Sequence, residues 1–185
     1  MFLSQSDFQF VPNQEDTSMN SEQLKAQQTP LKARYKAEPV AAQVTMHASG
    51  TLGTDSVTCD VSTPAGIIQA GLHSMAGGEE QWACSGDMLL QSLVACAGVT
   101  LKAVATALDI PLRGGRVHAE GDMDFRGTLG VSKETPIGFQ RIRLRFELDS
   151  DATPEQKQKL LSLTERFCVI FQTLKSPATI TSEIA

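Results

Sequence analysis

Two stretches in the second half of the chain alternate between apolar and polar side chains, which is the period of a β-strand with one buried face. The first, residues 117–125, places on one face Val117, Ala119, Gly121, Met123 and Phe125. The second, residues 141–148, places on one face Ile142, Leu144, Phe146 and Leu148. The polar face is mainly acidic in the first stretch and mainly basic in the second. We therefore predict two strands that pair across a solvated sheet surface.

Two other stretches follow the helical period. Residues 87–109 are the most apolar part of the chain, but polar residues such as Gln91 and Lys102 interrupt them too often for a membrane span. They predict a helix buried in a soluble core. The second helix, Thr153–Lys175, has a clear start, because Thr153 and Gln156 form a capping box. Its expected inward face consists of Leu160, Thr164, Phe167, Cys168, Phe171 and Leu174.

Shorter strands are predicted on both sides of these elements. Val40–Ala48 and Val57–Val61 read as strands separated by a turn-rich loop at 49–55, and Ile67–Leu72 reads as a third. A last strand is expected at Ala178–Ile184. In this predicted order, consecutive strands are followed by a helix, two further strands, a second helix and a last strand. Such an order, without strict alternation of strands and helices, predicts an α+β fold with antiparallel sheets and two central helices.

The polar start of the chain predicts no packed structure of its own. Residues 1–38 are rich in Gln, Ser, Asn and Glu, and we interpret them as an N-terminal extension that is flexible or lies on a partner. Residues 39–185 are then the folded domain.

Composition narrows the class of protein. The 185 residues carry a net charge of −5, which argues against binding to nucleic acid or to an anionic membrane. The first ten residues lack the basic region of a secretory signal, so we expect a cytoplasmic protein with reduced thiols.

The candidate chemistry lies in the cysteines. Cys96 and Cys168 are both expected in the middle of helices, and small neighbours around Cys96 would permit the tight crossing that a disulfide requires. On spacing alone, two ordinary buried thiols remain an alternative. Cys59 reads as a structural core thiol, whereas Cys84 is either a loop cysteine or a spare thiol at the mouth of the site. The three histidines lie far apart, so neither a metal nor a bound cofactor is predicted.

The segments around the two cysteines resemble the OsmC/Ohr family. Cys84-Ser85-Gly86-Asp87-Met88-Leu89-Leu90, running into Leu93-Val94-Ala95-Cys96-Ala97-Gly98, is similar to the central helix of that family. Glu165-Arg166-Phe167-Cys168, followed by Gln172-Thr173-Leu174, is similar to its second cysteine helix. The resemblance covers roughly residues 40–184 and implies an intertwined homodimer with sites at the subunit interface.

The resemblance also implies an activity, the reduction of organic hydroperoxides. Cys96 would attack the peroxide, Cys168 would resolve the sulfenic acid as a disulfide, and a dithiol would then reduce the disulfide. The family's peroxidases usually hold a Glu where this chain has Gly86, and Asp87 is the nearest acidic residue and a further candidate for the site. They also supply an Arg from a hairpin loop that here contains none, and Arg34 is the nearest upstream candidate. The alternative is a non-catalytic OsmC-like protein that binds a small hydrophobic ligand at its dimer interface.

Overall fold

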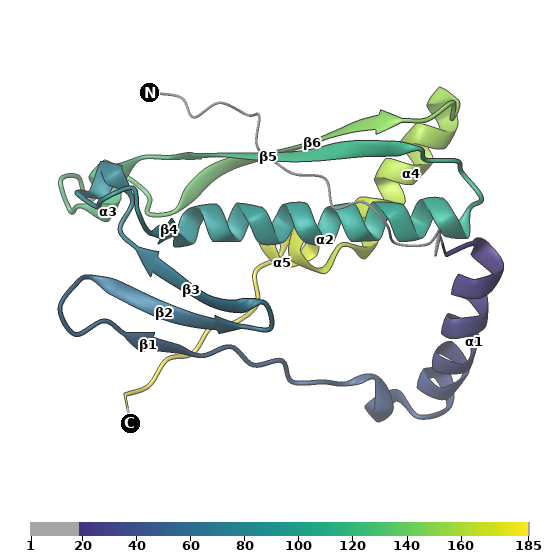
Figure 1. Cartoon of the computed structure of the whole chain (residues 1–185), viewed down its shortest axis with the longest axis horizontal. Helices are drawn as coiled ribbons and strands as arrows, with labels where there is room; N and C mark the ends of the chain where they lie inside the picture. Colours follow the sequence, from purple (N-terminus) through teal and green to yellow (C-terminus); the bar gives the residue numbers. More distant parts are fainter. Residues whose placement is uncertain (1–18, 185) are drawn as a thin grey trace.

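The computed structural model describes residues 19–184, and within them the helices and strands follow one another as an α+β fold (Figure 1). The elements are helix α1 (Ser21–Ala37), the 3-10 turn η1 (Pro39–Ala42), strands β1 (Gly50–Leu52), β2 (Thr58–Thr63) and β3 (Gly66–Gly71), turn η2 (Ser74–Ala76), strand β4 (Ala83–Cys84), helix α2 (Ser85–Ala107), strand β5 (Gly114–Met123), helix α3 (Phe125–Thr128), strand β6 (Phe139–Asp149), and helices α4 (Pro154–Phe167) and α5 (Val169–Lys175). Helix α2 runs between the β5–β6 ribbon and the sheet formed by β1 to β4 (Figure 1).

The β5–β6 ribbon confirms the prediction made from alternation. The two strands are antiparallel, and Glu120 lies opposite Arg143. Arg143 forms ion pairs with both Glu120 and Asp122 on the outer, solvated face. The apolar face is therefore left to cover α2. The predicted first strand reached Phe125, but the structure ends β5 at Met123, because Asp124 accepts a hydrogen bond from the Arg126 N–H and starts α3.

The core forms where α2 meets the ribbon and the C-terminal helices. One buried cluster consists of Leu101, Ala105, Ile110, Ala152 and Leu160, and the second consists of Leu93, Ala97 and Cys168. By length and apolar composition α2 could also cross a membrane, a test that the core helix of a soluble protein passes equally. Its packing against β5, α4 and α5 buries one face of the helix, with Leu93, Ala97, Leu101 and Ala105.

The N-terminal sheet differs in part from the prediction. The strands expected at Val57–Val61 and Ile67–Leu72 are present as β2 and β3. The prediction of a strand at Val40–Ala48 is wrong. Its residues form η1 and an irregular segment, and the first strand is β1, inside the expected loop. Gly50 makes this possible, because a Cβ there would lie 2.7 Å from the Cys59 Sγ atom and would hold β1 away from β2. The short β4 was not predicted, and it pairs parallel to β3 in an otherwise antiparallel sheet.

The predicted second helix is interrupted. The capping box of Thr153 and Gln156 starts α4 as expected. The helix ends at Phe167, Cys168 adopts an extended conformation, and α5 begins at Val169. Phe167, expected on the inward face, is 56% exposed. The prediction of a strand at Ala178–Ile184 is also wrong for the described chain, where these residues form no helix or strand.

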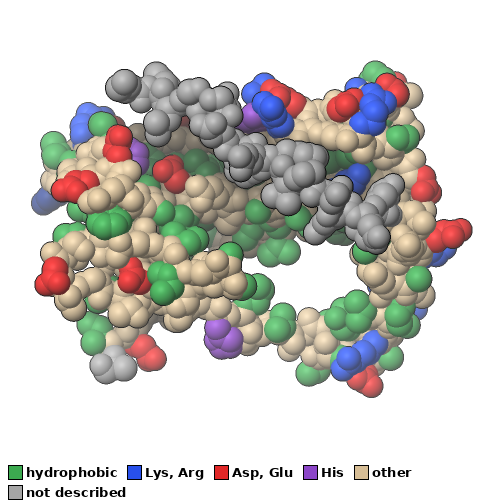
Figure 2. All heavy atoms as spheres, viewed as in Figure 1, with side chains coloured by type: hydrophobic (Ala, Val, Ile, Leu, Met, Phe, Trp, Pro, Cys, Tyr) green, Lys and Arg blue, Asp and Glu red, His purple; other side chains and the backbone are tan. Residues whose placement is uncertain are grey.

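Helix α1 lies within the segment predicted as a structureless extension. An Asn20–Gln23 capping box starts it, which is a local sequence signal for the beginning of a helix. None of its residues is buried. Figure 2 shows an opening bounded by α1, the segment that follows it and the body of the molecule. The rest of the extension, residues 1–18, lies outside the described residues, and the proposed domain boundary at residue 39 stays a prediction.

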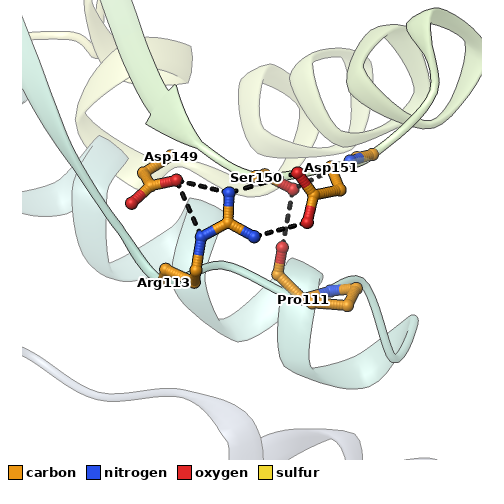
Figure 3. A network of polar contacts seen from close by, with 6 residues as sticks. Pro111, Arg113, Asp149, Ser150 and Asp151 are labelled. Carbon is orange, nitrogen blue, oxygen red and sulfur yellow. Dashed lines mark hydrogen bonds and ion pairs between the residues drawn. The ribbon is translucent and has the colours of Figure 1, made fainter.

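A polar clamp joins the start of β5 to the turn before α4 (Figure 3). The Arg113 guanidinium lies between the carboxylates of Asp149 and Asp151. Next to it, the Ser150 hydroxyl donates to the Pro111 carbonyl oxygen at 2.6 Å. These side chains are mostly exposed, so we attribute to the clamp an orienting role for α4 more than a large stabilisation.

Candidate functional site

The Cys96 and Cys168 thiols meet in the structure. Cys96 lies on α2 and is half-buried, whereas Cys168 is completely buried against Leu93 and Ala97. Cys96 packs against the cluster that contains Cys168, and each thiol affects the pKa of the other. The structure therefore brings together the two residues on which the sequence-based hypothesis depended.

Cys168 does not lie in the middle of a helix, as the sequence suggested. It ends α4 and precedes α5, with φ −72° and ψ 110°. Its Sγ atom accepts a hydrogen bond from the Phe171 N–H at 3.5 Å, which caps the start of α5. Because the first N–H groups of a helix have no partner within the helix, the break leaves the N–H groups of Val169 and Ile170 free to reach the other thiol.

These N–H groups make Cys96 the more acidic thiol. Burial alone would raise the pKa of Cys96 and is the largest single effect, but several hydrogen bonds together outweigh it. They come from the Ile170 N–H, the Cys168 thiol, the Val169 N–H and the Thr100 hydroxyl. The net result is a pKa of Cys96 below its usual value, without a cationic side chain among the causes.

Cys168 has the opposite tendency. Burial raises the pKa of the Cys168 thiol, and its hydrogen bond and proximity to Cys96 raise this pKa further. The Phe171 and Ile170 N–H groups act against this without reversing it. Of the two thiols, Cys96 is therefore the one that loses its proton more readily.

The other predicted site residues lie at the far end of α2. Asp87 is nine residues before Cys96, about 13 Å along the helix axis, so it does not approach the thiol pair within one chain. Cys84 is a further three residues away, at the start of α2, so within one chain it does not reach the thiol pair either. Asp87 and Cys84 instead share a separate cavity. Arg34 lies on the exposed α1 and is absent from the groups that affect Cys96.

The remaining candidates add no metal chemistry. Cys59 lies half-buried on β2 and is absent from the groups that affect the pKa of Cys96 and Cys168. Between residues 19 and 184, no three His, Cys, Asp or Glu side chains gather in a group that could hold a metal ion. Sequence reasoning missed Val169 and Ile170, because a backbone N–H donor leaves no side-chain signature.

Substituting proline for Val169 tests whether main-chain donors acidify Cys96. Proline removes the Val169 N–H, and it fits the first position of a helix after an extended residue such as Cys168. We expect the pKa of Cys96 to rise and its alkylation at pH 7 to slow, about tenfold for each pKa unit. The measurement is the pH dependence of iodoacetamide labelling, read on the Cys96 peptide by mass spectrometry. Val169→Ala keeps the N–H and serves as the control; an unchanged pH midpoint in Val169→Pro would contradict the assignment.

An α+β fold in which a cysteine of the central helix meets a cysteine at the break between two further helices defines a class of thiol-bearing proteins, and comparison with known proteins identifies the family. Residues 78–183 match the family model described as OsmC-like protein, which is more than half of the chain. The chain therefore belongs to the OsmC-like family. No curated protein matches the sequence.

Solved structures share the fold at low sequence identity. The OsmC-like protein from Mycoplasma pneumoniae aligns with a TM-score of 0.60 at 18% identity, over 73% of this chain and 90% of that one. An organic hydroperoxide resistance protein from Elizabethkingia anophelis gives 0.58 at 14% identity, over 73% and 92%. The organic hydroperoxide resistance protein OsmC from Legionella pneumophila gives 0.56 at 11% identity, over 72% and 93%. At these identities the likeness establishes the fold alone.

Proposed function

We propose that this protein is a thiol-dependent peroxidase that reduces organic hydroperoxides through Cys96 and Cys168. The observation that carries the proposal is the contact between the two thiols together with the lowered pKa of Cys96. Membership of a family that includes organic hydroperoxide resistance proteins supports it.

The reaction follows from the asymmetry of the pair. The Cys96 thiolate attacks the terminal peroxide oxygen, so that an S–O bond forms, the O–O bond breaks and the alcohol leaves with a proton. Cys96 is then a sulfenic acid in contact with Cys168. Attack by the Cys168 sulfur forms the disulfide and releases water. A dithiol reduces the disulfide by exchange and is itself oxidised, which restores both thiols.

The accessibility of the two thiols supports the same roles as their acidity, with Cys96 as the attacking thiol and Cys168 as the resolving thiol. Cys96 is half-buried and can be approached, whereas Cys168 is completely buried and is reached only by its neighbour. A buried resolving thiol needs no exposure, because its target forms in contact with it. A non-catalytic protein would not require this contact, so the geometry favours the peroxidase over the ligand-binding alternative.

We further infer that the protein is a homodimer, because one chain leaves more surface uncovered than a compact monomer would and exposes large apolar side chains on it. It exposes 15284 Å², whereas a compact monomer of 19.9 kDa exposes about 8,700 Å². The nineteen residues outside the described range would add at most about 3,000 Å² if fully extended. Roughly 3,600 Å² of excess remains on each chain, which is enough for an obligate dimer interface, where the two partners together bury about 2,000–5,000 Å² or more. Val99, in the middle of α2, and Val169, beside the thiol pair, are 73% and 68% exposed.

The dimer predicts a mass of about twice 19.9 kDa in sedimentation equilibrium. Val99→Lys places a charge in the middle of the expected interface and should shift the equilibrium towards monomer. Val131→Lys, at a similarly exposed valine in the loop after α3, is the matched control and should leave the dimer intact. A wild-type protein that sediments as a monomer would refute the inference.

The proposed activity is tested by mass spectrometry of the reduced protein after one equivalent of cumene hydroperoxide. We expect rapid formation of a disulfide between the Cys96 and Cys168 peptides, with Cys59 and Cys84 still alkylatable. If all four thiols survive while Cys96 remains open to alkylation, the peroxidase proposal fails.

A further inference from the structure

The edge of β6 that faces away from β5 has no partner strand. Among residues 19–184, β5 and β6 form a sheet of two strands that no other strand joins. When a strand has a neighbour on one side only, alternate residues direct their N–H and C=O groups towards the open side. The strand β6, Phe139–Asp149, therefore presents a long row of main-chain donors and acceptors that a further strand could use.

Two cavities follow this edge, between β6 and the C-terminal helices. The first, of about 390 Å³, lies between the first half of β6 and α5. The second, of about 420 Å³, lies between the second half of β6 and α4. Leu144 lines both, and we call the two adjacent cavities the β6 groove. Its apolar lining also includes Leu93, Leu101, Leu160, Phe171 and Leu174.

Cationic side chains predominate along the β6 groove. Arg141 and Lys175 line the first cavity, and Arg145 and Lys157 line the second. Glu165 is the one acidic lining residue in the part of the chain that the structure describes. The whole chain, in contrast, carries a net charge of −5. A local excess of positive charge on an acidic protein favours an anionic partner.

The groove lies on a different side of α2 from the expected dimer interface. Successive residues of an α-helix are about 100° apart, so Val99 points about 120° away from Leu93 and about 160° away from Leu101. Pairing between the β6 edges of two copies is also disfavoured, because it would bring Arg141 and Arg145 of one copy close to the same arginines of the other. A second copy of this chain is therefore a poor occupant of the groove.

We propose that the β6 groove binds an extended, acidic segment of a partner protein, which adds a strand to the edge of β6. In this mode of recognition, main-chain hydrogen bonds supply affinity and pockets for alternate side chains supply specificity. Ile142 lines the first cavity and Phe146 the second, and they are four residues apart, about 13 Å along the strand. The bound segment therefore has apolar side chains four positions apart. Acidic side chains between them lie on the face of Arg141 and Arg145. This interaction goes beyond the proposed peroxidase activity.

The probe is a fluorescently labelled peptide with blocked ends, Thr-Leu-Glu-Val-Glu-Leu-Thr, added to the full-length reduced protein. Its leucines are four positions apart on one face, and both glutamates lie on the other. We expect saturable binding in fluorescence anisotropy. Binding should be at least about tenfold weaker with lysine in place of both glutamates. The same loss is expected for Thr-Leu-Glu-Val-Leu-Glu-Thr, which has the same composition but places its leucines on opposite faces.

Methylation of the peptide main chain tests the addition of a strand directly. Alternate N–H groups of an added strand point towards β6 and away from it. One peptide is N-methylated at both glutamates, and the other at the valine and the second leucine. We expect one of the two to bind at least about tenfold more weakly than the unmethylated peptide, and the other to retain most of the binding.

Variants of the protein complete the test. Arg141→Glu reverses a charge on the groove and should weaken binding at least about fivefold. Lys133→Glu makes the same reversal at an exposed lysine before β6 that lines neither cavity, and should leave binding unchanged. The proposal is overturned if the peptide does not bind, if a folded Arg141→Glu protein binds it equally well, or if the two methylated peptides bind alike. It is also overturned if saturating peptide lowers the mass of the protein in sedimentation equilibrium, because the edge of β6 would then be a subunit interface.

Discussion

Replacing Cys96 with serine should reduce the turnover of cumene hydroperoxide by at least about a thousandfold, because a serine hydroxyl is not ionised at neutral pH and no other thiol contacts Cys168 in its place. Cys84 lies twelve residues away, about 18 Å along α2, and does not substitute. Turnover is followed in the presence of dithiothreitol, with circular dichroism as the check on folding. Retained turnover in the serine variant would rule out Cys96 as the attacking thiol.

Cys168→Ser distinguishes the two cysteines and serves as the companion variant. It retains Cys96 and the main-chain donors around it, so the first step should proceed once for each subunit. The sulfenic acid then accumulates, because its resolving partner is missing, and a cyclic dione reagent should trap it at Cys96. If Cys168→Ser instead fails to consume the first equivalent of peroxide, the order of the two roles is wrong.

The second large effect concerns stability. Leu160 on α4 is completely buried in the cluster that joins α4 to α2. Leu160→Ala should lower the free energy of unfolding by about 2–5 kcal/mol, since it removes buried apolar surface and leaves a cavity. The measurement is urea denaturation at a fixed protein concentration, because an associating chain gains stability with concentration. Leu129→Ala, at a 56% exposed leucine, should change the free energy by less than about 0.5 kcal/mol; equal effects would show that α4 is not part of the cooperative core.

The sequence predicted best those elements whose signals are local. The β5–β6 ribbon follows from alternation, and its charge pairing follows from residues such as Glu120 and Arg143. The start of α4 follows from its capping box, and α2 follows from its length and apolar composition. In these cases the side chains that specify an element lie within it.

The errors occur where the structure depends on distant contacts or on backbone geometry. The break at Cys168 contains neither glycine nor proline, so the sequence around it predicts one continuous helix. The placement of β1 depends on the approach of Gly50 to Cys59. At the candidate site, the resemblance to a family identified Cys96 and Cys168, but only the structure showed their contact, its main-chain donors, and the distance of Asp87 from both.

The main-chain origin of the acidifying hydrogen bonds has a consequence for how this site withstands mutation. A guanidinium that activates a thiol is lost with a single codon change, whereas the N–H groups of Val169 and Ile170 persist under replacement by every amino acid except proline. The reactivity of Cys96 is then inherited with the path of the backbone and survives sequence drift for as long as the chain still breaks its helix at Cys168. Relatives with different side chains at both positions would retain the same activation.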